Sequence, residues 1–292
     1  MAQNRIEWLD TAKGLLITLV IAGHIIYPDR QLAFGDNGQA FIYSFHIPAF
    51  FIISGLLKNR SLYINKVRDF KTAFYKQEKT IRYYCVFSII FFLRYILQYI
   101  SGHNTMDDVI CFALNSITGL GMGALWFLPC FVISELIFFT VVKYKRFMQY
   151  VYPVLICSSL LYLSGYSYNV EIEKYDMTHK LFHILFRSFI GSSFVFIGYY
   201  LDKLKCLEGK WLLLSIVSLC YLLNGGTDMR TLTVGNVLLY YIFAISGTML
   251  IFGVAIFLSQ YNVNQLFAKW GGILCSLCVR IPYLWSFSQS IT

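Results

Sequence analysis

The sequence predicts an all-α fold, a polytopic bundle of helices embedded in a membrane. Of its 292 residues, 58% are hydrophobic and only 13% are charged. A soluble protein of this size carries about 25% charged residues, so this chain lacks the charge to cover a water-facing surface. Several apolar runs of about 15 to 25 residues are long enough to cross a bilayer as helices.

The apolar runs predict about eight to nine spans in a single domain covering residues 1–292. Residues 104–123, between the third and fourth spans, are mildly apolar and are predicted to form a re-entrant or lid segment. A weaker apolar segment from Gly271 to Phe287 follows the last clear span. The clear spans are residues 12–27, 40–57, 82–100, 125–142, 148–165, 181–201, 210–224 and 235–258.

The basic residues predict the side of the membrane on which each connection lies. Most of the 24 lysines and arginines lie before the first span or after every second span, above all in residues 58–82. The alternate connections hold only Arg30, Lys174, Lys180 and Arg230. Because cytoplasmic loops are enriched in Lys and Arg, the N-terminus is predicted to be cytoplasmic, in the inner or plasma membrane of a cell.

The net charge of +9 is accounted for by these loops, so a lipid bilayer and not a nucleic acid is the expected partner. Apart from Cys275 and Cys278 in the weaker apolar segment, the eight cysteines form no C-x-x-C pair, and they lie mostly in apolar runs. They are expected to be free thiols, and no metal site is predicted.

Two histidines, His24 and His46, lie inside the first two spans, at the end predicted to face outward. An ionisable side chain within a span is costly and by default indicates a functional site. The competing interpretation is that both histidines only form hydrogen bonds between helices.

Lys13 and His24 are eleven residues apart, which is about three helical turns and about 16 Å along the axis, so both lie on one face. Asp10 precedes Lys13 by three residues, a normal spacing for an ion pair. This face is expected to look into the bundle or into a wet cavity, because facing lipid is expensive.

This combination of residues suggests acyl transfer from a phosphate-bearing donor to an alcohol. A neutral imidazole takes a proton from a hydroxyl as the oxygen attacks an acyl carbon. A cation at the cytoplasmic end holds phosphate. We expect His24 to be a general base or transient acyl acceptor, His46 to position the hydroxyl or assist proton transfer, and Lys13, held by Asp10, to contact the donor.

Further polar residues lie in later spans. Glu135 is expected to pair with Arg187 or Arg94, either as a structural ion pair or in substrate binding. Trp126 is expected either to belong to the aromatic belt at the membrane–water interface or to stack against a sugar.

Asp228-Met229-Arg230 and Gly235-Asn236 resemble the fucose 4-O-acetylase-like branch of the membrane acyltransferase family 3, and the N-terminal pattern resembles that of the family as a whole. The pattern is R-x4-D-x2-KG…GH, followed by FH-x-P-x-FF-x2-SG. The matching residues are Arg5, Asp10, Lys13, Gly14, Gly23, His24, Phe45, His46, Pro48, Phe50, Phe51, Ser54 and Gly55.

This resemblance implies a bundle of about ten helices and a polysaccharide O-acetyltransferase of the bacterial cell envelope. The donor is then acetyl-CoA, the acceptor is a glycan or lipid-linked sugar, and the histidine matching His24 is catalytic. The alternatives are a transporter or flippase of a lipid-linked sugar and a catalytically inactive member of the family.

Residues 271–292 depart from the family pattern and are expected to be an incomplete tail. With suitable codons for Gly272 to Pro282, a reading frame shifted by two bases encodes Asn-Thr-Leu-Phe-Ile-Met-Cys-Thr-His-Pro, which is close to the segment expected there. The hypothesis is that the C-terminus is truncated or frameshifted.

Overall fold

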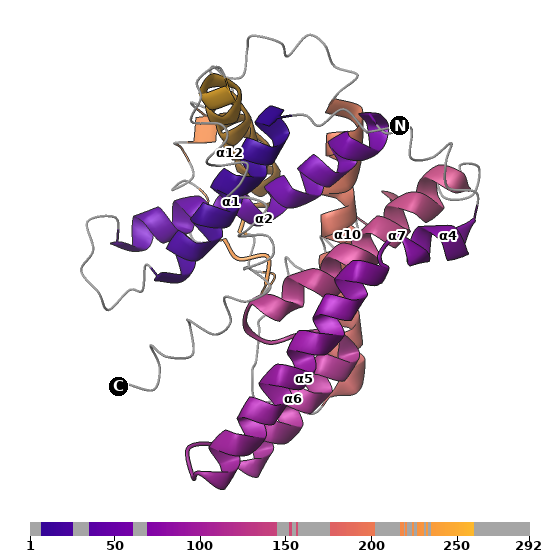
Figure 1. Ribbon diagram of the computed structural model, residues 1–292. Helices are drawn as coiled ribbons and strands as arrows, with labels where there is room; N and C mark the ends of the chain where they lie inside the picture. The colour runs from indigo at the N-terminus through magenta and orange to yellow at the C-terminus, as the bar shows by residue number, and fades with distance from the viewer. Residues whose placement is uncertain are drawn as a thin grey trace. The chain divides into compact units, whose positions relative to one another are not determined.

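The computed structural model (Figure 1) confirms the all-α class. It describes residues 7–25, 35–60, 69–144, 152–153, 156, 176–201, 217–218, 220, 224, 227–230, 232 and 235–259. The regular elements in these ranges are helices. They are α1 Glu7–Ile25, α2 Gly35–Arg60, α4 Phe70–Tyr75, α5 Glu78–Ile100, α6 Met106–Thr118, the 3₁₀ helix η1 Gly123–Trp126, α7 Phe127–Lys143, α10 Met177–Leu201 and α12 Val237–Ser259.

Within the described residues, five stretches are long and apolar enough to cross a membrane, which supports a multi-pass membrane protein. They are Gly38–Lys58, Glu78–Ile100, Met106–Lys143, Met177–Leu201 and Val237–Ser259. The predicted spans 148–165 and 210–224 lie mostly outside the described residues, and the tail 271–292 lies wholly outside them. The total number of spans therefore stays a prediction.

The structure divides into two compact units. Unit 1 comprises Met1–Leu56 and Gly198–Thr292, and unit 2 comprises Leu57–Ile197. In unit 1, α1 packs along α12, and the rings of Trp8 and Phe252 meet edge to face at 5.3 Å. Phe252 is one of the buried residues of α12.

Two glycines allow α2 to approach its neighbours in unit 1 closely. A Cβ on Gly247 of α12 would lie 2.4 Å from the ring of Phe45, which is fully buried. A Cβ on Gly198 of α10 would lie 1.9 Å from the carbonyl oxygen of Ile52. Small residues of this kind are what allow membrane helices to pack backbone against backbone.

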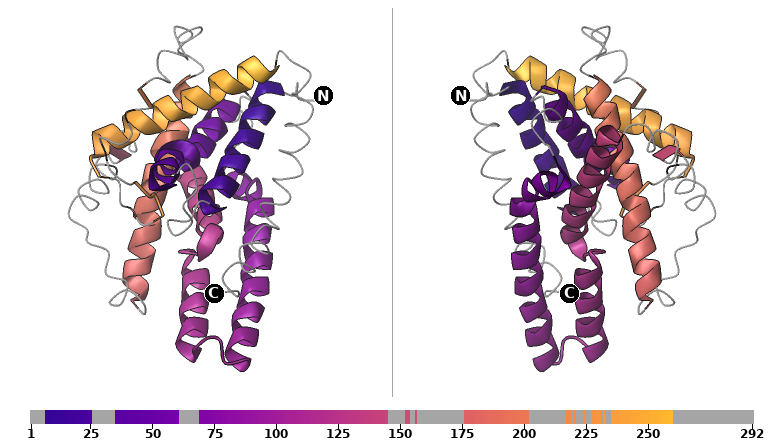
Figure 2. Two further views of the ribbon diagram at one scale, coloured as in Figure 1. Left: turned by 90° about the vertical axis from the view of Figure 1, so that its left-hand side faces the viewer. Right: turned by 90° about the vertical axis from the view of Figure 1, so that its right-hand side faces the viewer.

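In unit 2, the first turns of α5 lie beside the start of α7, and the later part of α5 runs beside α6 (Figure 2). Residues 104–123, expected as a re-entrant or lid segment, contain the helix α6. A capping box starts this helix: the Asp108 amide donates to the Thr105 hydroxyl, and the Thr105 amide donates to the Asp108 carboxylate. The ring of Tyr95 stacks on that of Phe112 at 4.7 Å, which holds α5 against α6.

The helix breaks between α6 and α7. Gly119, Gly121 and Gly123 all have positive φ, and a Cβ on Gly121 would lie 2.5 Å from the backbone nitrogen of Trp126. Only glycine fits this backbone without strain. Residues 106–143 are therefore a discontinuous helix whose two parts are joined by a glycine-rich turn.

We expect Gly198→Ala to lower the free energy of unfolding by about 3 kcal/mol, because the new methyl group meets the rigid backbone of α2 and not a side chain that can move. Thermal unfolding of the full chain in detergent measures the effect. The control is Gly102→Asn, since Gly102 (φ +76) has open space around its Cβ position and Asn tolerates this backbone region. Equal melting temperatures for wild type and Gly198→Ala would contradict the close approach.

Candidate functional site

Helix α1 carries three of the four residues predicted to form the site. The Lys13 ammonium lies 3.2 Å from the Asp10 carboxylate, and both side chains are partly exposed, so the predicted ion pair is confirmed. The helix continues without a break to Ile25, which keeps the positions of Lys13 and His24 on one face about 16 Å apart along the axis. The His24 side chain lies outside the part that the structure describes.

Helix α2 carries His46, which is buried, with 6% of its surface exposed. Its Nδ1 lies 2.7 Å from the carbonyl oxygen of Ile42. Because a carbonyl oxygen only accepts, Nδ1 must carry the hydrogen of this bond. In the neutral ring, Nε2 is then the nitrogen with the lone pair, the one able to take a proton or accept a hydrogen bond.

The two helices meet at Gly23, the residue before His24. The Gln39 amide and the Tyr43 hydroxyl both donate to the Gly23 carbonyl, at 3.3 and 3.4 Å. A Cβ on Gly23 would lie 3.0 Å from the Tyr43 ring, so glycine sets the close approach. The structure thus places the α1 turn that contains His24 against the α2 face that contains His46.

Tyr43 connects this contact to the second histidine. Its ring and the imidazole of His46 lie 5.1 Å apart, centroid to centroid. Gln39 and Tyr43 were not among the predicted site residues. The signal that could have found them is their spacing from His46, seven and three residues along a helix, which places all three on one face.

Pro48 lies in the interior of α2, because this helix begins at Gly35. The polar run of residues 35–39 is helical although it is not apolar, which is why hydropathy missed it. Because proline has no N–H, the carbonyl of Ser44 loses its helical donor, two residues from His46.

Glu135 pairs with a different residue from the one that the sequence predicts. Its carboxylate forms an ion pair with Lys58 and accepts a hydrogen bond from the Gln77 side-chain amide at 3.3 Å. The predicted partner was Arg187 or Arg94. Lys58 is 7% and Glu135 2% exposed. Lys58 is at the end of α2 and Gln77 is at the start of α5, so this buried group connects these two helix ends to α7 inside unit 2.

Arg187 has a different environment in unit 2. Its guanidinium carbon lies 4.7 Å above the ring of Trp126, and its Nη1 donates to the Leu120 carbonyl at 3.3 Å. Trp126 is therefore buried against a cation, which fits neither expected role, a belt residue or an open platform for a sugar. Lys180 and His183 lie on the same face of α10 as Arg187 and are also buried.

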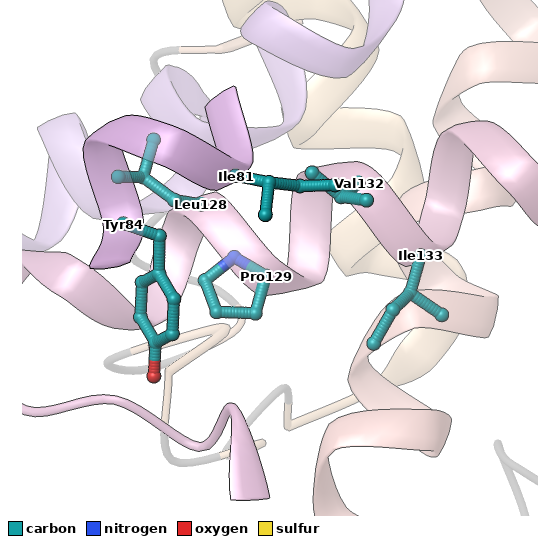
Figure 3. Close-up of a pocket in the computed structure, with 6 residues that line it drawn as sticks. All are labelled: Ile81, Tyr84, Leu128, Pro129, Val132 and Ile133. Atoms are coloured by element: carbon teal, nitrogen blue, oxygen red, sulfur yellow. The ribbon is translucent and has the colours of Figure 1, made fainter. Parts of the chain in front are cut away.

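A cavity of about 140 Å³ lies between α5 and α7 (Figure 3) and contains none of the predicted site residues. Ligand pockets are commonly about 300 to 1,000 Å³, so this one is too small for a donor such as a coenzyme. No group of three or more His, Cys, Asp or Glu is placed to hold a metal within the described ranges. The cavity is apolar and is lined by Ile81, Tyr84, Leu128, Pro129, Val132 and Ile133.

Comparison with known proteins gives one match. A family model described as an acyltransferase domain matches residues 6–285, a range that includes all four predicted site residues. No curated protein and no solved structure matches the chain.

The buried pair of Lys58 and Glu135 gives a prediction about stability. Removing one partner, as in Lys58→Met or Glu135→Leu, leaves an uncompensated charge and should cost about 3 to 5 kcal/mol. The double variant should recover most of that loss, because both charges disappear together. Chemical unfolding of the four proteins in detergent forms a double-mutant cycle, and additive losses would show that the two side chains do not interact.

Proposed function

The chain belongs to acyltransferase family 3, and we propose that it moves an acetyl group from acetyl-CoA to a hydroxyl of a cell-surface glycan sugar. The family and the apolar helices establish a membrane acyltransferase. The identity of the donor and acceptor is the proposed part. The observation that supports the proposal is the contact among Gly23, Tyr43 and His46. Through this contact, the turn of α1 that contains His24 packs against the part of α2 that contains His46.

In the proposed reaction, a histidine takes the proton of the acceptor hydroxyl while the oxygen attacks the thioester carbon of acetyl-CoA. The carbon–sulfur bond breaks, and the coenzyme thiolate leaves and receives the proton, so the reaction yields the acetyl ester and free CoA. His24 is the base or a transient acyl acceptor. His46, with Nε2 as its accepting nitrogen, orients the hydroxyl or relays its proton, and Tyr43 positions His46.

Lys13 is proposed to contact the CoA phosphates, with Asp10 holding its side chain in place. A lysine binds phosphate as a compact charge and works best where water and ligand reach it. The partial exposure of Lys13, 35% for its side chain, fits that role. The basic loops support a cytoplasmic N-terminus, which places Lys13 on the side where acetyl-CoA is made.

The transporter alternative has one observation in its favour, the break between α6 and α7. Discontinuous helices are frequent at the substrate sites of transporters. A transporter or flippase would move a lipid-linked sugar without consuming acetyl-CoA, whereas the proposed enzyme releases one CoA for each ester formed. An inactive family member would do neither.

The first test is acetyl transfer by purified His24→Ala and His46→Ala proteins, measured as release of free CoA with a glycan acceptor. Each should lose about 100-fold or more in turnover, the usual contribution of a positioned acid or base. His103→Ala is the matched control, because His103 is exposed in the connection between α5 and α6. Unchanged turnover by inserted His24→Ala protein would remove His24 from catalysis.

The second test concerns the donor. Lys13→Gln should raise the KM for acetyl-CoA about tenfold and change kcat less, because a phosphate contact is made equally in the ground state and the transition state. Asp10→Asn should have a smaller effect of the same kind. Lys79→Gln, at an exposed position near the start of α5, is the control. A fall in kcat at constant KM would assign Lys13 to the chemistry.

A further inference from the structure

One face of α7 carries both the short helix α4 and the apolar cavity between α5 and α7. The helix α4 packs through Ala73 on Phe139, and it lies beside α7 in Figure 1. The α7 residues that line the cavity include Pro129 and Val132. These two residues, Leu136 and Phe139 are three or four positions apart in turn, so they lie along one face of α7. The helix and the cavity are therefore adjoining parts of one surface of unit 2.

The helix α4 is buried on the side of α7 and exposed on its other sides. Ala73 is 1% exposed, whereas Phe70, Phe74 and Tyr75 are 47%, 46% and 58% exposed. Phe70 and Phe74 are four residues apart, so their rings are neighbours on the outer surface of the helix. A helix of six residues is too short to be stable by itself. The exposed rings indicate that a further apolar partner covers this surface.

The helix α4 lies at the ends of two candidate membrane spans. The stretch Glu78–Ile100 begins three residues after α4, and the stretch Met106–Lys143 ends one turn beyond Phe139. The Gln77 side-chain amide donates to Glu135 at 3.3 Å, which holds the start of α5 against α7. Span ends lie at the membrane–water interface, where aromatic side chains are enriched. The exposed rings of α4 are thus at the level of the lipid head groups.

The surface around these rings is positively charged. Lys71 and Lys76 are exposed on α4 and at its end, and Lys143 is exposed at the end of α7. Asp69 caps α4 by accepting a hydrogen bond from the Thr72 amide at 2.8 Å, and it offsets one of the three lysine charges. Lysines beside aromatic rings at the end of a span are the combination that attracts anionic lipid.

The cavity offers a place for an acyl chain (Figure 3). Its volume is about 140 Å³, enough for part of one chain. Tyr84 lines it with the ring, because the Tyr84 hydroxyl donates to the Ser116 carbonyl at 2.7 Å. Five of the six lining residues are half-buried and only Val132 is buried, so the cavity is reached from the outside of unit 2.

We propose that α4 and this cavity form one binding site for an anionic phospholipid of the bilayer. Lys71, Lys76 and Lys143 contact the head-group phosphate, and the rings of α4 pack beside the glycerol. One acyl chain enters the cavity, about 10 Å further along α7. A soluble anion would use only the lysines, and an uncharged apolar partner would use only the rings and the cavity. A phospholipid with a net negative charge uses all three.

Protection of the full chain from thermal unfolding in detergent tests the site. The probe is dioleoyl phosphatidylglycerol, and dioleoyl phosphatidylcholine is the comparison. Phosphatidylglycerol should reach half of its full effect at a mole fraction at least about tenfold lower, because only this lipid carries a net negative charge. Equal effects of the two lipids on wild type would overturn the proposal.

Substitutions on α4 test the head-group contact. Lys71→Gln and Lys76→Gln should each need about fivefold more phosphatidylglycerol, which is the usual effect of one basic residue near a membrane surface. Lys71→Arg keeps the charge and should behave as wild type. Arg230→Gln, at an exposed position in unit 1, is the control. An unchanged preference for phosphatidylglycerol in both Gln variants would contradict the assignment to α4.

Ile133→Phe tests the cavity by filling it. It should raise the half-protecting mole fraction of both lipids at least about fourfold, the effect of one methylene group that leaves an apolar site. Ile137→Phe is the matched control, because Ile137 lies on the opposite face of α7. Ile81→Phe fills the cavity from α5 and provides the same test if Ile133→Phe does not fold. Protection equal to that of Ile137→Phe would remove the acyl chain from the cavity.

The soluble compound sn-glycerol 3-phosphate distinguishes a lipid from a free anion. It carries the phosphate without acyl chains, so it should not protect wild type. Protection of wild type and not of Lys71→Gln would identify a site for a soluble anion and overturn the proposal. The lipid site does not rest on the proposed function. A protein that phosphatidylglycerol protects but that transfers no acetyl group would refute the proposed function and leave the lipid site standing.

Discussion

The close approach of α2 to α1 at Gly23 is the contact on which the candidate site depends. One backbone carbonyl accepts hydrogen bonds from both Gln39 and Tyr43, which fixes two turns of α2 against the turn before His24. Lipid provides no hydrophobic force that brings membrane helices together, so hydrogen bonds of this kind help to fix which faces of the two helices meet. A Cβ at position 23 would lie 3.0 Å from the Tyr43 ring, so this ring would have to shift by a few tenths of an ångström.

The rest of unit 1 holds α2 in the position that this contact requires. Gly198 and Gly247 admit the backbone at Ile52 and the ring of Phe45, so α2 is packed closely on two further helices. The helix is thereby fixed on several sides although Pro48 removes a hydrogen bond from its interior. A proline in that position loosens the backbone next to His46, and the close packing of α2 on its neighbours opposes that loosening.

The sequence predicts best those structural features that depend on residues close together in the chain. Long apolar runs give the helices, and the ion pair of Asp10 with Lys13 follows from a spacing of three within one helix. The partner of Glu135 could not be found in this way, because Lys58 and Gln77 are far away in the chain and local spacing carries no information about them. Residues 104–123 were predicted only as a re-entrant or lid segment, and the break that follows α6 depends on three glycines whose φ values the sequence does not show.

The hydrogen bond of His46 limits what this residue can contribute to the proposed transfer. A carbonyl oxygen holds the Nδ1 hydrogen in place, but it carries no full negative charge with which to stabilise an imidazolium, as a carboxylate does in a catalytic triad. In the neutral ring, this hydrogen bond leaves Nε2 as the nitrogen that can accept a hydrogen bond. That arrangement suits a residue that orients the acceptor hydroxyl, and it leaves the larger share of proton transfer, or the transient acyl group, to His24.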